Sequence, residues 1–254
     1  MTVHEFGKEN DNAIVLIHPS LVMWDYFEYV IPLLADTYHL YVPALPGYDK
    51  DNTGDFTSVE QIADELSGWL MNHGVYEIKC IYGCSMGGSI VTRMLADSKI
   101  RICSAVIDGG ITPYPFPFIV TRMIAIRDFL MIYSGKAGGI KLLEKAFSTD
   151  EYSEEDLKYI AGVLKMISAR TIWRTFESCN NYSMPGRINN AGNSIEYWYS
   201  SSEKKARKRD INYIKKYFPQ TCFREFDNVG HAGLATLHPE ILTEGIAKLC
   251  EKTK

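Results

Sequence analysis

The feature that most restricts the fold of this chain is a regular alternation of short apolar runs with stretches of helical periodicity. The apolar runs are 13–17, 39–42, 77–82 and 104–107, and the helical stretches between them are 24–35, 58–72 and 85–96. Strands that alternate with helices of this length predict an α/β fold, a mostly parallel sheet with crossover helices on both faces.

The alternation stops after residue 111 and resumes near residue 191. The segment between these positions begins with the proline-rich sequence PYPFPF, and its helical stretches are 119–133, 142–147 and 154–177. Beyond it come apolar runs at 195–199 and 221–226 and a last helical stretch at 239–252. We therefore expect a core made of residues 1–111 and 191–254, with a helical cap inserted at 112–190.

The charge balance restricts the class of partner. A net charge of −4 over 254 residues shows no basic excess, so we expect no nucleic-acid partner. One basic run, at 204–209, leads into Ile211, Ile214 and Phe218, which have the spacing of a buried helix face. This run is interpreted as the solvated side of that helix, and an anion-binding patch or a targeting signal is the alternative.

The cysteines and the hydropathy pattern indicate a reduced, cytoplasmic protein. The six cysteines form no CxxC pair and no zinc-type spacing with histidine, and several lie in apolar runs, where cysteine usually packs as a small apolar residue. The first residues are polar and lack the apolar core of a signal peptide. No stretch reaches the roughly 18 apolar residues of a membrane span, so we expect no integral membrane association.

Residues 82–88, YGCSMGG, place Ser85 between Gly83 and Gly87, directly after an apolar run and before a helical stretch. A sharp strand-to-helix turn of this kind exposes a serine hydroxyl above the sheet edge and requires small residues two positions away on each side. Ser85 is therefore the candidate nucleophile. The alternative is a serine that only caps the following helix.

A nucleophilic serine needs a base, and the base needs an acid. His231, in the loop DNVGHAGL after the last apolar run, is the candidate base. The chain order serine, acid, histidine favours Glu203, just past residues 195–199. Glu203 could instead be a capping acid in the first turn of a helix. Asp108 is the second candidate, and Asp227 is disfavoured because it is too near His231 in sequence.

An acyl-transfer site also needs donors for the developing oxyanion. The backbone N–H of Met86, the residue after the nucleophile, is the first expected donor. The second is expected in the loop His18-Pro19-Ser20 that follows the first long apolar run. Because proline has no N–H, we expect Ser20 to supply it.

With these residues in place, the sequence resembles the α/β-hydrolase fold superfamily over nearly its full length. The matching motifs, in order, are IVLIHPS, VPALPGYD, YGCSMGG, IEYWYSSSE and VGHAGLATLHPE. The resemblance implies a mostly parallel eight-stranded sheet under a helical cap, and the triad Ser85, Glu203 and His231. Pro19 stands where this family commonly has glycine, and Glu203 where it commonly has aspartate.

The expected activity is hydrolysis of a small-molecule carboxylic ester through an acyl-enzyme, without metal or cofactor. Apolar residues in the range 116–133 favour an uncharged substrate with an apolar part. Cleavage of a C–C bond, thioester, amide or peptide would use the same triad. A protein of another class, a ligand-binding sensor that retains the pocket, is a further alternative.

Overall fold

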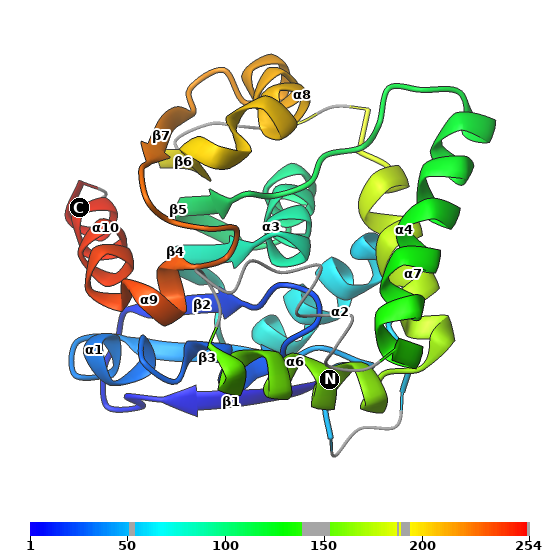
Figure 1. Ribbon diagram of the computed structural model, residues 1–254. Helices are drawn as coiled ribbons and strands as arrows, with labels where there is room; N and C mark the ends of the chain where they lie inside the picture. The colour runs from blue at the N-terminus through cyan, green and yellow to red at the C-terminus, as the bar shows by residue number, and fades with distance from the viewer. Residues whose placement is uncertain (51–53, 139–152, 187, 189–193, 253–254) are drawn as a thin grey trace.

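The computed structural model describes residues 1–50, 54–138, 153–186, 188 and 194–252, and a seven-stranded sheet lies at its centre (Figure 1). The strands, in the spatial order β1-β3-β2-β4-β5-β6-β7, are β1 (Thr2–Phe6), β2 (Ala13–Ile17), β3 (His39–Ala44), β4 (Glu77–Cys84), β5 (Arg101–Asp108), β6 (Ser194–Ser200) and β7 (Cys222–Phe226). Among these described strands, only the pairing of β1 with β3 is antiparallel. The mostly parallel sheet is confirmed, but the described residues form seven strands where the resemblance implies eight.

Helices cover both faces of the sheet. One face packs against α2 (Val59–Asn72), α3 (Met86–Asp97) and α8 (Lys204–Tyr217), and the other against η1 (Trp24–Phe27), α1 (Ile31–Ala35), α9 (Leu234–Leu237) and α10 (Pro239–Lys252). In β2, Val15 and Ile17 belong to the first apolar cluster, and Ile14 and Leu16 to the second. Both faces are buried, which explains why the strand is a continuous apolar run.

One strand was missed, and two helix predictions were wrong. Strand β1 was not predicted, because its polar sequence gains its strand character from pairing with β3. The helix expected at 24–35 is interrupted where Pro32 enters the first turn of α1, a position that proline favours. The helix expected at 154–177 is two helices, because Ser168 starts a new one by accepting the Thr171 N–H at 2.9 Å. The helix expected at 142–147 lies outside the described residues.

Between β5 and β6 the chain forms α4 (Phe118–Gly138), α6 (Glu154–Met166) and α7 (Ala169–Asn181), here called the inserted helices. Figure 1 shows α4 beside α7, beyond the carboxyl ends of the central strands. Helix α7 presents buried hydroxyls to the core: Thr171 accepts the Phe56 N–H at 3.2 Å, and Ser178 accepts the Val59 N–H at 2.8 Å. These bonds fix α7 to the segment that leads into α2.

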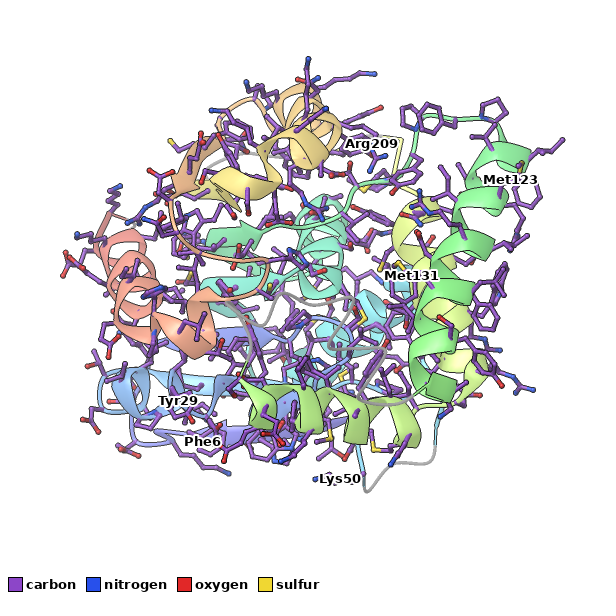
Figure 2. All side chains as sticks on the ribbon, in the orientation of Figure 1. Phe6, Tyr29, Lys50, Met123, Met131 and Arg209 are labelled. Atoms are coloured by element: carbon purple, nitrogen blue, oxygen red, sulfur yellow. The ribbon has the colours of Figure 1, made fainter. Side chains whose placement is uncertain are left out.

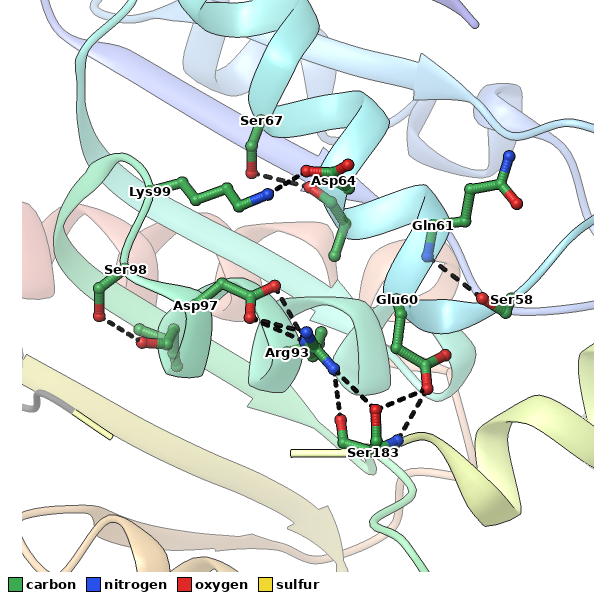
Figure 3. Close-up of polar contacts among 12 residues, drawn as sticks. Ser58, Glu60, Gln61, Asp64, Ser67, Arg93, Asp97, Ser98, Lys99 and Ser183 are labelled. Carbon is green, nitrogen blue, oxygen red and sulfur yellow. Dashed lines mark hydrogen bonds and ion pairs between the residues drawn. The ribbon is translucent and has the colours of Figure 1, made fainter. Parts of the chain in front are cut away.

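The segment that returns from α7 to the sheet is held by charged side chains of α2 and α3 (Figure 3). The Arg93 guanidinium donates to the Ser183 carbonyl oxygen at 2.6 Å and also pairs with Asp97. Glu60 accepts the Ser183 N–H at 2.8 Å. The inserted helices are therefore joined to the core by polar contacts at both ends of α7.

Replacing Ser178 by alanine tests this attachment. The variant leaves the Val59 N–H buried without its acceptor, so we expect the free energy of unfolding to fall by about 1–3 kcal/mol in urea denaturation. Ser134→Ala is the matched control: Ser134 is exposed and bonds only the Met131 carbonyl within its own helix, so a change of less than about 0.5 kcal/mol is expected. Equal effects in the two variants would contradict the assignment.

Candidate active site

Ser85 occupies the sharp turn between β4, which ends at Cys84, and α3, which begins at Met86. Its φ of 51° and ψ of −110° lie in a region that residues other than glycine rarely adopt. The Ser85 N–H donates to the Asp108 carbonyl oxygen at 2.8 Å, which ties the turn to the end of β5. Ser85 thus has the strained backbone that the sequence motif predicts.

Two glycines make this turn sterically possible. A Cβ atom on Gly83 would lie 2.3 Å from the Gly87 carbonyl oxygen, and one on Gly87 would lie 2.3 Å from the Ile17 carbonyl oxygen. Real Cβ atoms do not approach backbone oxygens so closely, so any larger residue would displace the turn. The close approach also brings the start of α3 against the end of β2.

His231 and Glu203 meet at the same edge of the sheet. Glu203 ends the short helix η2 (Ser201–Glu203) after β6, and His231 lies in the loop after β7. The His231 Nδ1 atom is 2.8 Å from Glu203 Oε1, an ion-pair distance. Burial acts to raise the pKa of Glu203, but its hydrogen bond and charge interactions with His231 and Arg207 outweigh burial and hold that pKa below its usual value.

Gly109 connects His231 with the turn around Ser85. A Cβ atom on Gly109 would lie 3.1 Å from His231 Cε1, so the imidazole packs directly against this glycine. The preceding residue, Asp108, is the one whose carbonyl accepts the Ser85 N–H. The structure therefore brings Ser85, His231 and Glu203 to one place at the carboxyl ends of β4, β5 and β6.

Asp108, the second candidate for the acid, has a different environment. Its Oδ2 atom accepts a hydrogen bond from the Tyr82 hydroxyl at 2.6 Å. Burial raises the pKa of Asp108 to about 6, against the opposing effects of the Tyr82 bond and of the nearby His231. Between these two acids, Glu203 is the one held ionised beside His231.

The loop His18-Pro19-Ser20 follows β2 next to the start of α3. The His18 side chain is fully buried, and its Nδ1 lies 2.7 Å from the Pro19 carbonyl oxygen, so Nδ1 carries the proton. Burial lowers the pKa of His18 to about 4, which keeps the ring neutral at pH 7. A Cβ atom on Gly87 would lie 3.0 Å from the His18 carbonyl oxygen, so the predicted donor loop borders the helix start that contains Met86.

The sequence reasoning missed two residues that support Glu203. Arg207 donates from Nε to Glu203 Oε1 at 3.1 Å, and its Nη1 reaches Asp210 at 3.4 Å. Asp210 is fully buried and also accepts the N–H and hydroxyl of Thr112 at 2.9 and 2.8 Å. The spacing of four residues between Glu203 and Arg207 on a helix is the signal that could have found this pair.

Several apolar residues within 116–133, the range that favoured a substrate with an apolar part, lie on the molecular surface. Phe118, Met123 and Met131 of α4 are 66%, 65% and 59% exposed. Phe129, on another side of the helix, is partly buried and packs against the core cluster. Most of the apolar character of this segment therefore gives no information about the substrate.

Comparison with known proteins identifies the family. The family described as alpha/beta hydrolase fold matches residues 12–212, most of the chain. The chain belongs to the alpha/beta hydrolase fold family. The match of this alpha/beta hydrolase to the family spans β2 to α8 and includes the turn around Ser85.

Solved structures of the same fold cover nearly the whole chain. A protein of the alpha/beta hydrolase family from Desulfitobacterium hafniense is 20% identical, with a TM-score of 0.75, covering 98% of this chain and 99% of its own. A structure from work on carboxylesterases of Nitrososphaera gargenis is 19% identical (TM-score 0.77; 99% and 95% covered). A thermophilic esterase from Thermogutta terrifontis is 16% identical (TM-score 0.74; 99% and 93% covered). At these identities the likeness concerns the fold.

The described residues of this alpha/beta hydrolase contain neither a candidate metal site nor a candidate membrane span. None of their His, Cys, Asp and Glu side chains form a group of three or more that could hold a metal ion. None of their helices has both the length and the hydrophobicity needed to cross a bilayer.

The raised pKa of Asp108 predicts a pH-dependent stability difference. The folded state favours the neutral form of the Asp108 carboxyl. The contribution of this carboxyl to folding stability is therefore complete below its ordinary pKa of 3.8 and is lost as pH rises through about 6. Asp108→Asn keeps an acceptor for Tyr82 and cannot ionise. In urea unfolding, we expect the free energy of unfolding of the variant, relative to that of wild type, to increase by about 2–3 kcal/mol between pH 4 and pH 8.

The exposed Asp11 provides the control for this experiment. Asp11→Asn should show the same difference from wild type at both pH values, because the Asp11 side chain stays in contact with water in the folded protein. If the difference in unfolding free energy between Asp108→Asn and wild type is the same at pH 4 and pH 8, the prediction of a raised pKa for Asp108 is wrong.

Proposed function

We propose that this alpha/beta hydrolase is a serine esterase that hydrolyses carboxylic esters of small to medium size. Ser85 is the nucleophile, His231 the base and Glu203 the acid. The observation that carries the proposal is the position of the His231 imidazole, which contacts Glu203 on Nδ1 and Gly109 beside the Ser85 turn.

The reaction would proceed by two acyl transfers. His231 takes the proton of the Ser85 hydroxyl through Nε2, and the oxygen attacks the ester carbonyl carbon to give a tetrahedral oxyanion. The oxyanion collapses, the alcohol leaves with the proton from His231, and an acyl-enzyme remains. Water activated by the same imidazole then releases the carboxylic acid and restores Ser85.

The backbone N–H groups of Ser20 and Met86 are the proposed oxyanion donors. Met86 is the first residue of α3, where N–H groups are not used within the helix and the helix dipole favours negative charge. The contact of Gly87 with the Ile17 and His18 carbonyls supports a short distance between the two donors. The neutral His18 ring adds no competing charge to this loop at pH 7.

Glu203 would hold the imidazole in the tautomer that leaves Nε2 free to accept a proton, and would stabilise the imidazolium formed during attack. Its lowered pKa means that this contribution is present at neutral pH and is lost as pH falls through the pKa of Glu203. Arg207 is a positioning residue in this proposal, because its Nε–H bonds the same Oε1 atom that contacts His231.

The inserted helices would form a cap over the site, within residues 112–190. Their place after β5 and beyond the carboxyl ends of the strands supports this, since the proposed triad lies at that edge. Two of the similar structures support esters as the substrate class. The one from Nitrososphaera gargenis comes from work on carboxylesterases, and the one from Thermogutta terrifontis is described as an esterase.

Turnover of p-nitrophenyl butyrate by purified variants tests the proposal. Ser85→Ala should lower kcat by about 10³-fold or more, because the nucleophile is lost. Glu203→Gln should lower kcat by about 10²- to 10⁴-fold, since an amide cannot stabilise the imidazolium. Asp108→Asn is the matched control for the acid and should stay within about tenfold of wild type.

Two results would contradict these assignments. If Ser85→Ala kept wild-type turnover, the reaction would not use this serine. If Asp108→Asn lost more activity than Glu203→Gln, Asp108 would be the acid. Circular dichroism of each variant checks that a loss of turnover does not come from unfolding.

A further inference from the structure

Helix α4 exposes an unusually large apolar surface. Phe118, Ile119, Met123, Ile126, Leu130 and Met131 are between 43% and 72% exposed. Their neighbours Phe116, Val120 and Tyr133 are 46%, 41% and 42% exposed, so nine large apolar side chains face water on and just before one helix. Contiguous exposed apolar surfaces of this kind mark interaction sites in soluble proteins. A surface of this size indicates a binding face.

The exposed apolar arc is wider than the contact line of one partner helix. Ile119, Met123, Ile126 and Leu130 follow the alternating spacing of four and three residues that defines a helix–helix seam. Phe118, Val120 and Met131 lie outside this seam and are also exposed. A flat apolar medium could cover the whole arc, whereas a single helix would cover only the seam.

A basic groove adjoins the beginning of this helix. It has a volume of about 570 Å³ and lies between Pro115 and α8, where Lys205, Lys208, Arg209 and Lys216 line it. Arg209 lies over the Tyr114 ring, 3.4 Å from its centroid. Pro115 is followed directly by the exposed Phe116, so the cationic and apolar surfaces meet in the segment that leads into α4. Figure 2 labels Arg209 on α8 and Met123 on α4.

The two helices are depleted of exposed negative charge. Helix α4 carries three Lys or Arg residues and α8 carries seven, although the whole chain has a net charge of −4. Within these two fully described helices the carboxylates are Asp128 and Asp210, which are 9% and 0% exposed. Cationic and apolar groups therefore face solvent here without exposed acids among them.

We propose that the apolar side of α4 and the basic groove beside α8 together bind the surface of an anionic phospholipid bilayer. The apolar side chains would enter the boundary between headgroups and acyl chains, and the lysines would contact the phosphates. Arg127, 72% exposed in its side chain and paired with Asp128 at 2.7 Å, would lie at the headgroup level. This inference does not rest on the esterase proposal.

Co-sedimentation of the full chain with phospholipid vesicles tests the inference. Vesicles of phosphatidylcholine alone are compared with vesicles containing about one third phosphatidylglycerol, at low and high salt. We expect binding to the anionic vesicles that is at least about tenfold tighter than binding to the neutral ones, and that weakens as salt increases.

Paired variants separate the two surfaces. Lys208→Gln with Lys216→Gln should weaken binding to anionic vesicles by about 10- to 30-fold, and Ile119→Ser with Met123→Ser by at least about tenfold. The control, Lys8→Gln with Lys248→Gln, removes two similarly exposed lysines elsewhere and should bind as wild type. Ser85→Ala should also bind as wild type, so failure of the esterase proposal would leave this result unchanged.

Three outcomes would overturn the inference. One is absence of binding to either kind of vesicle by the folded protein. A second is equal binding to both kinds with no effect of the lysine variants. The third is a stable dimer in analytical ultracentrifugation that Ile119→Ser with Met123→Ser dissociates, without vesicle binding, because a second copy would then cover α4.

Discussion

Three backbone segments approach one another closely at the turn around Ser85. The positions of the other groups of the candidate site depend on this contact. Gly87 lies against the Ile17 carbonyl, and a Cβ atom on Gly88 would come within 2.6 Å of the Gly110 Cα. The start of α3 is therefore in contact with the ends of both β2 and β5. A side chain at either glycine would separate the segments that this geometry joins.

This contact positions the other groups of the candidate site. The end of β5 supplies the carbonyl of Asp108 for the Ser85 N–H, and Gly109 provides the surface against which His231 packs. On the opposite side, Glu203 is held by Arg207, which also reaches the buried Asp210. Because Asp210 binds Thr112 as well, Glu203 is connected through Arg207 and Asp210 to the point where the chain leaves the sheet for the inserted helices.

Most strands and the residues of the candidate site could be predicted because their sequence neighbours form a recognisable pattern. The buried strands are continuous apolar runs, and the turn around Ser85 has glycines at fixed positions. Strand β1 and the buried Asp210 have no such signal, since pairing with β3 and bonding to Thr112 depend on residues far away in the chain. The outward orientation of Phe118 and Met123 likewise follows from how α4 packs on α7.

Labelling with a fluorophosphonate, followed by mass spectrometry of tryptic peptides, tests the central claim most directly. Trypsin should release residues 80–93, which contain Ser85 and Ser89, and fragmentation distinguishes the two serines. Assignment of Ser85 as the nucleophile predicts one adduct, on Ser85, that is absent in Ser85→Ala and forms much more slowly in Glu203→Gln. An adduct on another residue, or equal labelling of Ser85→Ala and wild type, would contradict it.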